Sequence, residues 1–213
     1  MPYSHIIWDW NGTLLNDTFW CIAQMNKMLV KRKLKPFASI SDYHKVFRFP
    51  IAEYYRDVGF DFAEESFEIL AQEYIELYHG EGSSNLKLHD GSENVLKAIL
   101  EKQITQIILS ASDRQNLHTQ LAPFEISQYF DELLGISDIY GKSKIEIGLD
   151  YLKRNDVTKG LMIGDTVHDF EVSRAMGIDC TLVAHGHQSK EALLKCGAPV
   201  FGGLAEVLEF ILT

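Results

Sequence analysis

The sequence predicts an α/β protein in which a parallel sheet receives a helical insertion directly after its first strand. From about residue 86 onward, short apolar runs alternate with segments of helical periodicity, which is typical of βαβ units. Residues 16–83 instead contain amphipathic helical patterns and no clear strand. We therefore expect a core domain made of residues 1–15 and 84–213, and a helical cap domain made of residues 16–83.

The expected strands of the core are short runs of apolar residues that would be buried on both faces of the sheet. They cover residues 6–8, 105–110, 161–163, 180–184 and 199–201. Helical patterns between them cover residues 91–102, 113–123, 142–154, 168–176, 189–195 and 203–212. In the pattern at 142–154, Ile145, Leu149 and Leu152 have the i, i+4, i+7 spacing of an apolar helix face.

The insertion contains two long amphipathic patterns and two short ones. Asp17 precedes the first pattern and is placed to cap it, with Ile22, Met25 and Leu29 on one face. Shorter helices are expected at 40–46 and 51–58, a second long helix at 63–79, and a flexible exit at 80–84. An insertion at this point can close over the strand ends and exclude water.

Composition excludes several classes of partner. The chain has 213 residues, with 46% hydrophobic and 23% charged residues, as in soluble globular proteins. Its net charge of −10 argues against nucleic acid and against an anionic membrane surface. Cys21, Cys180 and Cys196 are widely spaced, which indicates neither a disulfide framework nor a zinc site. Without a signal-like or membrane-spanning segment, a cytoplasmic location is expected.

Four polar signals stand where predicted strands end or a helix begins. They are Asp9, Ser110, Lys144 and the stretch 164–169, Gly-Asp-Thr-Val-His-Asp. Taken singly, each has a simpler structural reading as a helix cap, a turn residue or a solvated lysine. Because strand ends of a parallel sheet meet at one edge, the whole set predicts a common site there.

The residue types suit phosphoryl transfer. A carboxylate such as Asp9 can attack phosphorus and form an aspartyl-phosphate, which divides one difficult hydrolysis into two steps. Asp165 and Asp169 can join Asp9 in supplying oxygen ligands to Mg²⁺, which offsets the repulsion between carboxylate and phosphate. Ser110 can donate a hydrogen bond to a phosphoryl oxygen, and Lys144 places a positive charge where negative charge accumulates.

These motifs resemble those of the haloacid dehalogenase (HAD) superfamily. Residues 9–14, Asp-Trp-Asn-Gly-Thr-Leu, resemble its first motif, Asp-x-Asp-Gly-Thr; Ser110, Lys144 and residues 164–169 resemble the other three. The resemblance extends over essentially the whole chain, which is similar to the phosphoglycolate phosphatase-like branch. It implies a Rossmann-like core, a helical cap and a Mg²⁺-dependent phosphohydrolase that acts on a small phosphorylated metabolite, as a monomer or homodimer.

The resemblance also implies roles for particular residues. Asp9 would be the nucleophile, and the catalytic set is Asp9, Asn11, Ser110 and Lys144. The metal ligands would be Asp9, the backbone carbonyl of Asn11, Asp165 and Asp169. Gly12, Thr13, Ser110, Ala111 and Lys144 would contact the substrate. No proline follows the lysine of the third motif, which leaves Lys142 as a rival to Lys144.

Asn11 stands where the phosphatases of the family carry a second aspartate that moves a proton. An amide cannot do this at working pH, and such help is typically worth about 10²–10⁴-fold in rate. The enzyme then favours good leaving groups such as acyl or aryl phosphates, or another residue supplies the proton, or the chain binds its ligand and turns it over slowly. Candidate proton carriers are His44, His168 and His187.

Other chemistries of the superfamily remain as alternatives. A dehalogenase would not need Asp165 and Asp169. A phosphonate-cleaving enzyme would need a cap lysine, and the candidates are Lys27, Lys31, Lys33, Lys35 and Lys45. A phosphometabolite-binding or regulatory protein and a phosphotransferase are the further alternatives. Arg48 lies among apolar cap residues and is a candidate substrate contact or an ion-paired arginine, whereas residues 186–189 border the site or begin a helix.

Overall fold

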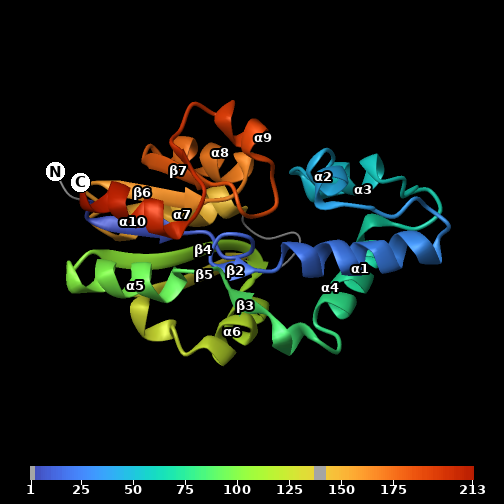
Figure 1. The fold of residues 1–213 in the computed structure, drawn as a ribbon, viewed down its shortest axis with the longest axis horizontal. Coiled ribbons are helices and arrows are strands. Elements are labelled where there is room, and N and C mark those ends of the chain that lie inside the picture. The colour runs from blue at the N-terminus through green and yellow to red at the C-terminus, as the bar shows by residue number, and fades with distance from the viewer. Residues whose placement is uncertain (1–2, 137–142) are drawn as a thin grey trace.

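A six-stranded parallel sheet forms the centre of the protein (Figure 1). The computed structural model describes residues 3–136 and 143–213. The sheet order is β5-β4-β1-β6-β7-β8, with parallel pairing throughout. Its strands are β1 (His5–Trp8), β4 (Thr105–Asp113), β5 (Glu132–Ile136), β6 (Gly160–Gly164), β7 (Asp179–Val183) and β8 (Val200–Phe201). A small antiparallel pair joins β2 (Leu15–Asn16) to β3 (Lys87–Leu88).

Helices cover both faces of this sheet because alternate strand residues are apolar on both sides. The core helices are α5 (Ser92–Glu101), α6 (Arg114–Leu121), α7 (Lys144–Arg154), α8 (Val167–Met176), α9 (Lys190–Leu194) and α10 (Leu204–Leu212). Three short 3₁₀ helices cover Ser83–Asn85, Ala122–Phe124 and Ser127–Tyr129. Ile6 and Trp8 belong to the apolar cluster that includes residues of α5 and α10, whereas Ile7 belongs to the one that includes residues of α7 and α8.

The insertion after β1 folds into four helices with a core of their own. They are α1 (Thr18–Lys31), α2 (Ile40–His44), α3 (Ile51–Asp57) and α4 (Phe67–Tyr78). Met25, Met28, Tyr43, Tyr54 and Leu70 are buried together in this core. Figure 1 shows the four helices beside the edge of the sheet where β1 ends, so they are positioned to cover whatever lies at the strand ends. We keep 16–83 as the proposed limits of this cap.

The structure confirms the predicted fold class and corrects it in detail. β5 was not predicted, because Glu-Leu-Leu-Gly-Ile has neither strict alternation nor a continuous apolar run. The last cap helix begins at Phe67 rather than at residue 63. It begins there because the side chain of Ser66 accepts the N–H of Ile69 and caps the helix. The expectation that Asp17 caps α1 was wrong, since its side chain makes no capping hydrogen bond.

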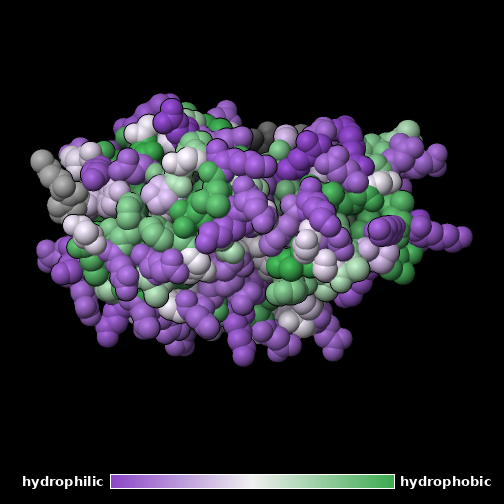
Figure 2. All heavy atoms as spheres, turned by 45° about the horizontal axis from the view of Figure 1, so that its top comes forward, coloured by the Kyte–Doolittle hydropathy of each residue, from purple (hydrophilic) through white to green (hydrophobic). Residues whose placement is uncertain are grey.

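The surface is mostly polar. Figure 2 shows one face of the molecule, where hydrophilic residues predominate and apolar residues form scattered patches. Among the residues that the structure describes, no helix is long and apolar enough to cross a membrane.

Candidate active site

The segment that follows β1 makes a sharp turn at the strand ends. Asp9 is buried there, and Gly12 has a φ of 79°, a conformation that glycine adopts at little cost. A Cβ atom at Gly12 would lie 2.4 Å from Asp165 Oδ2 and 2.5 Å from a ring carbon of His187. Only a glycine therefore allows the backbone of this turn to approach the end of β6 so closely.

Lys144 connects two carboxylates of the predicted set. It is the first residue of α7, a helix whose start is fixed by a capping box between Ser143 and Glu146. Its Nζ lies 2.5 Å from Asp9 Oδ1 and 2.6 Å from Asp169 Oδ1. All three side chains are buried, so Lys144 belongs to this cluster, whereas its rival Lys142 lies outside the described residues.

Thr13 links Asp9 to the third carboxylate. Its Oγ1 lies 3.0 Å from Asp9 Oδ2 and 2.9 Å from Asp165 Oδ1. The other oxygen of Asp165 accepts the backbone N–H of His187 at 2.6 Å. Asp169 accepts the N–H and the hydroxyl of Thr166 in a second capping box at the start of α8. The turns after β1, β6 and β7 thus hold these acidic side chains in place.

The cluster has more negative than positive charge, and burial makes the imbalance costly. Burial raises the pKa of Asp9 to about 6 although Lys144 opposes the shift, and raises that of Asp165 to about 8 against the opposing charge of His187. At Asp169 burial acts in the same direction, but Lys144 outweighs it and leaves the pKa below its usual value. Ligand oxygens of Asp9, Asp165 and Asp169 lie within 4.8 Å of one another. Three carboxylates that offer only oxygen atoms, with too little positive charge around them, fit Mg²⁺.

The side chain of Asn11 makes its hydrogen bonds outside this cluster, with partners in both the insertion and the core. Its Nδ2 donates to Asp17 Oδ2 at 2.8 Å and to the Tyr78 hydroxyl at 3.2 Å. Its Oδ1 accepts the hydroxyl of Ser112 at 2.8 Å. Both ends of the amide are therefore engaged, and the nitrogen is directed at a carboxylate.

Asp17 is the residue of the site that sequence reasoning placed wrongly. Its buried carboxylate accepts the N–H of Gly12 at 2.9 Å and the hydroxyl of Tyr78 at 2.7 Å. His187 Nε2 lies 3.3 Å from Asp17 Oδ1, and its Nδ1 pairs with the Tyr43 hydroxyl at 2.7 Å. Burial alone would raise the pKa of Asp17, but His187, Asn11 and Tyr78 outweigh it and lower the pKa.

The loop after β7, which contains residues 186–189, contacts both the core and the helical insertion. It lies beside Asp165, as expected if these residues border the site. Gln188 accepts the N–H of Val167 at 2.6 Å and donates to the backbone carbonyl of Phe47 at 3.1 Å. His44 of α2 contacts the carbonyl of Gly186 at 3.0 Å. Ser189 caps α9, so the same loop also begins a helix. Several cap–core contacts thus meet beside Asp165.

The remaining predicted residues make contacts of their own with residues outside the cluster. Ser110 is buried, and its Oγ accepts the N–H of Ser112 at 3.0 Å; Ala111 is partly exposed beside it in β4. His168 stacks on Phe49, with ring centroids 4.5 Å apart. Arg48 is not brought into the buried set, because it is half-exposed and its Nε pairs with Asp57 Oδ2 at 2.7 Å. Its role as a substrate contact stays a prediction.

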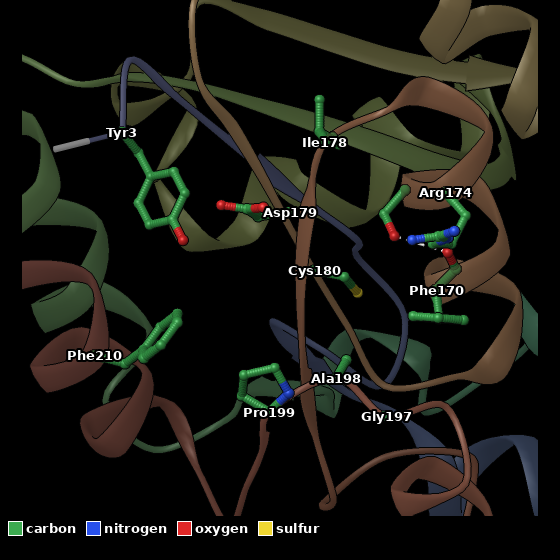
Figure 3. Close-up of a pocket in the computed structure, with 11 residues that line it drawn as sticks. Tyr3, Phe170, Arg174, Ile178, Asp179, Cys180, Gly197, Ala198, Pro199 and Phe210 are labelled. Carbon is green, nitrogen blue, oxygen red and sulfur yellow. Dashed lines mark hydrogen bonds between the residues drawn. The ribbon is translucent and has the colours of Figure 1, made fainter. Parts of the chain in front are cut away.

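A separate pocket lies at the opposite ends of the strands. Figure 3 shows Tyr3, Ile178, Asp179, Pro199 and Phe210 around it. Asp179 is the first residue of β7, whereas Asp165 follows the last residue of β6. Since parallel strands run in one direction, this pocket and the carboxylate cluster are at opposite edges of the sheet.

The parallel sheet, the four-helix insertion and the buried acidic edge define a class of α/β hydrolytic enzymes with a cap. The chain matches the profile of the family "Haloacid dehalogenase-like hydrolase" over residues 6–183, and it belongs to that family. A curated relative, the "Putative pyrophosphatase PpaX" of Caldanaerobacter subterraneus, is 28% identical over 125 residues, which cover 55% of this chain and 54% of the relative. The match thus spans about half the length of that curated protein.

Solved structures share the fold along the whole chain. A protein of Clostridium acetobutylicum, described as a "predicted phosphatase", has a TM-score of 0.85 at 22% identity. The match covers 100% of this chain and 99% of the other chain. A haloacid dehalogenase-like hydrolase of Streptococcus pneumoniae has a TM-score of 0.80 at 19% identity, with 98% of each chain covered. Protein Tyrosine Kinase A of Mycobacterium tuberculosis has a TM-score of 0.80 at 20% identity, with 99% and 98% covered. At these identities the likeness shows the fold alone.

Proposed function

We propose that this protein is a Mg²⁺-dependent phosphohydrolase that acts on a small phosphorylated metabolite through an aspartyl-phosphate on Asp9. The observation that carries the proposal is the position of the Asp9 carboxylate between Lys144 and Thr13, at the end of β1. Asp165 and Asp169 complete a buried set of oxygen ligands beside it. Membership of a hydrolase family supports the same reaction class.

In the proposed reaction the Asp9 carboxylate attacks phosphorus, a new P–O bond forms, and the leaving oxygen departs with the electron pair of the broken bond. Lys144 balances the charge of Asp9, and Thr13 orients its second oxygen. Ser110 would donate its hydroxyl hydrogen to a phosphoryl oxygen. Bound Mg²⁺ would offset the repulsion between the carboxylate and the phosphate. Water then attacks phosphorus, the bond between phosphorus and the Asp9 oxygen breaks, and inorganic phosphate leaves, which regenerates the Asp9 carboxylate.

The leaving group decides which substrates suit this site. Asn11 carries no exchangeable acid proton, and its amide is committed to Asp17, Tyr78 and Ser112. We therefore propose substrates whose leaving group departs without protonation, such as acyl or aryl phosphates. A phosphoanhydride belongs to the same class, which agrees with the pyrophosphatase name of the curated relative.

A panel of acyl, aryl and alkyl phosphates, with and without Mg²⁺, tests the proposal. We expect Mg²⁺-dependent turnover that is fastest for acyl and aryl phosphates. Asp9→Asn should reduce it by at least about 10³-fold, as removal of a nucleophile typically does. Asp90→Asn, at an exposed carboxylate outside the cluster, is the matched control. Undiminished turnover in Asp9→Asn with an intact fold would overturn the mechanism.

One observation favours a second candidate, a phosphometabolite-binding protein with weak turnover. The engaged amide of Asn11 leaves binding through the cluster intact while it removes proton transfer. A metabolite that raises the melting temperature of the wild type without being hydrolysed would favour this candidate. The phosphonate-cleaving alternative gains no support, because Lys27, Lys31, Lys33, Lys35 and Lys45 are all exposed.

A further inference from the structure

A second group of ligand-type side chains lies beside the carboxylate cluster and has different chemistry. Asp17 precedes α1, Cys21 is in the first turns of α1, and His187 is in the loop after β7. All three are buried, and one ligand atom from each lies within 4.8 Å of the others. The proposed phosphohydrolase reaction uses none of these three side chains.

Two distances between the donor atoms are close to those of a tetrahedral metal site. With Zn–O, Zn–N and Zn–S bonds of about 2.0–2.3 Å, neighbouring donors of a tetrahedral zinc ion are about 3.3–3.6 Å apart. His187 Nε2 lies 3.3 Å from Asp17 Oδ1, and Cys21 Sγ lies 3.5 Å from Asp17 Oδ2. The two distances reach different oxygens of Asp17, and one donor atom from each of the three residues lies within 4.8 Å of the others, so the side chains must draw closer together to bind one ion.

Surrounding groups hold two of the donors in place. The Tyr43 hydroxyl pairs with His187 Nδ1, which directs Nε2 toward Asp17. Gly12 and Tyr78 donate hydrogen bonds to the Asp17 carboxylate. Partners of this kind fix the orientation of metal ligands in known sites, and their loss typically weakens metal binding by about 10–100-fold.

Charge is also balanced with and without an ion. An ionised Asp17, a protonated His187 and a neutral Cys21 thiol sum to zero. A Zn²⁺ ion with an ionised Asp17, a Cys21 thiolate and a neutral His187 also sums to zero, because the ion displaces two protons. A buried site that stays neutral in both states avoids the cost of an uncompensated charge.

We propose that Asp17, Cys21 and His187 form a binding site for Zn²⁺ or a similar borderline cation, separate from the all-oxygen Mg²⁺ site. A thiolate and an imidazole select such cations, whereas Mg²⁺ prefers oxygen. The wide cysteine spacing gave no indication of it, because the two other ligands are at the start of α1 and in a loop more than 160 residues away. Since Cys21 lies in the helical insertion and His187 in the core, a bound ion ties the two together.

Cobalt substitution tests the site without any assay of activity. Metal-free, reduced protein is titrated with Co²⁺, and the near-ultraviolet absorption of a thiolate–cobalt bond is recorded. We expect one equivalent to produce this band in the wild type and in Asp9→Asn, which removes a ligand of the other cluster only. Cys21→Ser should abolish the band, and Cys180→Ser is the matched control because Cys180 is outside the group.

Competition between the protein and a zinc-binding dye then measures affinity. Tyr43→Phe retains all three ligands and should weaken Zn²⁺ binding by about 10–100-fold, while Cys21→Ser should weaken it further. An absent band, a band that persists in Cys21→Ser, or equal Zn²⁺ affinity in wild type and Cys21→Ser would overturn the proposal. None of these outcomes bears on the phosphohydrolase proposal, since no substrate is present.

Discussion

The two sides of the segment from Asp9 to Asn11 are built differently. On the sheet side, Asp9 meets Lys144, Thr13 and Asp169, all from the α/β core, in a buried set of full charges. On the cap side, Asn11 and Tyr78 of α4 donate to the single carboxylate of Asp17, which also lies beside His187. The reactive charges are therefore held by the core alone, whereas the cap-side contacts depend on how the helical insertion lies against the core.

The largest effect on stability is expected on the sheet side. Lys144→Met leaves the carboxylates of Asp9 and Asp169 buried without their common cation, which should cost about 3–5 kcal/mol of unfolding free energy. Urea unfolding without Mg²⁺ measures it. Lys153→Met, on the exposed face of the same helix, removes only a surface pair with Asp150 and should cost at most about 1 kcal/mol. Similar losses in both variants would contradict the charge argument.

The next largest effect on stability is expected when the amide of Asn11 and the carboxylate of Asp17 are exchanged, one residue at a time. Asn11→Asp places a carboxylate where an amide now donates to Asp17 at 2.8 Å. It loses a hydrogen bond to a charged group and adds repulsion, which should cost about 3 kcal/mol or more. Adding Asp17→Asn restores an amide–carboxylate pair and should recover more than about 1 kcal/mol. Additive losses in the double variant would show that the two residues are not coupled.

The Asn11→Asp variant also tests whether turnover depends on proton transfer by residue 11. If Asn11→Asp gave a large gain in turnover of alkyl phosphates, the binding-protein candidate would be favoured. Rates equal to those of the wild type would indicate that proton transfer by residue 11 is not needed for the substrate in use.

Removing one cap hydroxyl should have a smaller effect. Tyr78→Phe loses the 2.7 Å hydrogen bond to Asp17, which should cost about 1.5–2 kcal/mol. Thermal or urea unfolding measures the loss. Tyr129→Phe, in the 3₁₀ helix at Ser127–Tyr129, is the control and is expected to change stability by less than about 0.5 kcal/mol. If Tyr78→Phe lowers the free energy of unfolding no more than Tyr129→Phe does, a water molecule takes the place of the lost hydroxyl beside Asp17.

The smallest change in stability is expected at Arg48. Its ion pairs with Asp57 and Glu53 are half-exposed, so Arg48→Ala should change stability by at most about 1 kcal/mol. If Arg48 contacts the substrate as predicted, KM rises while kcat is nearly unchanged. Arg56→Ala, a neighbouring cap arginine paired with Glu53, is the control. An unchanged KM would remove Arg48 from the substrate-binding set.

Local pattern was sufficient for most of the core and for the sheet-side cluster. Asp9, Lys144 and Asp165 each follow a strand or open a helix, and parallel topology alone brings such positions to one edge. Strand β5 was not predicted because its five residues contain a glycine and a glutamate and are mostly half-buried.

The cap side could not be predicted by the same reasoning. An aspartate before a helix is ordinarily a cap, and this local rule gave the wrong role for Asp17. Its actual partners Tyr78 and His187 are 61 and 170 residues away along the chain, so only the packing of the insertion on the core reveals them. The signal that could have been used was the proximity of Asp17 to Asn11 in sequence.

The short stretch from Asp9 to Cys21 has a consequence for how this chain tolerates change in length. Loops usually accept insertions and deletions, since little depends on their register. Here a single residue added or removed between Thr13 and Asp17 would shift the register of β2 against β3, because β2 lies within this stretch. It would also displace Asp17 and Cys21 from their contacts with Asn11 and His187. Variation in length is therefore expected to be tolerated elsewhere on the surface and rejected in these few residues.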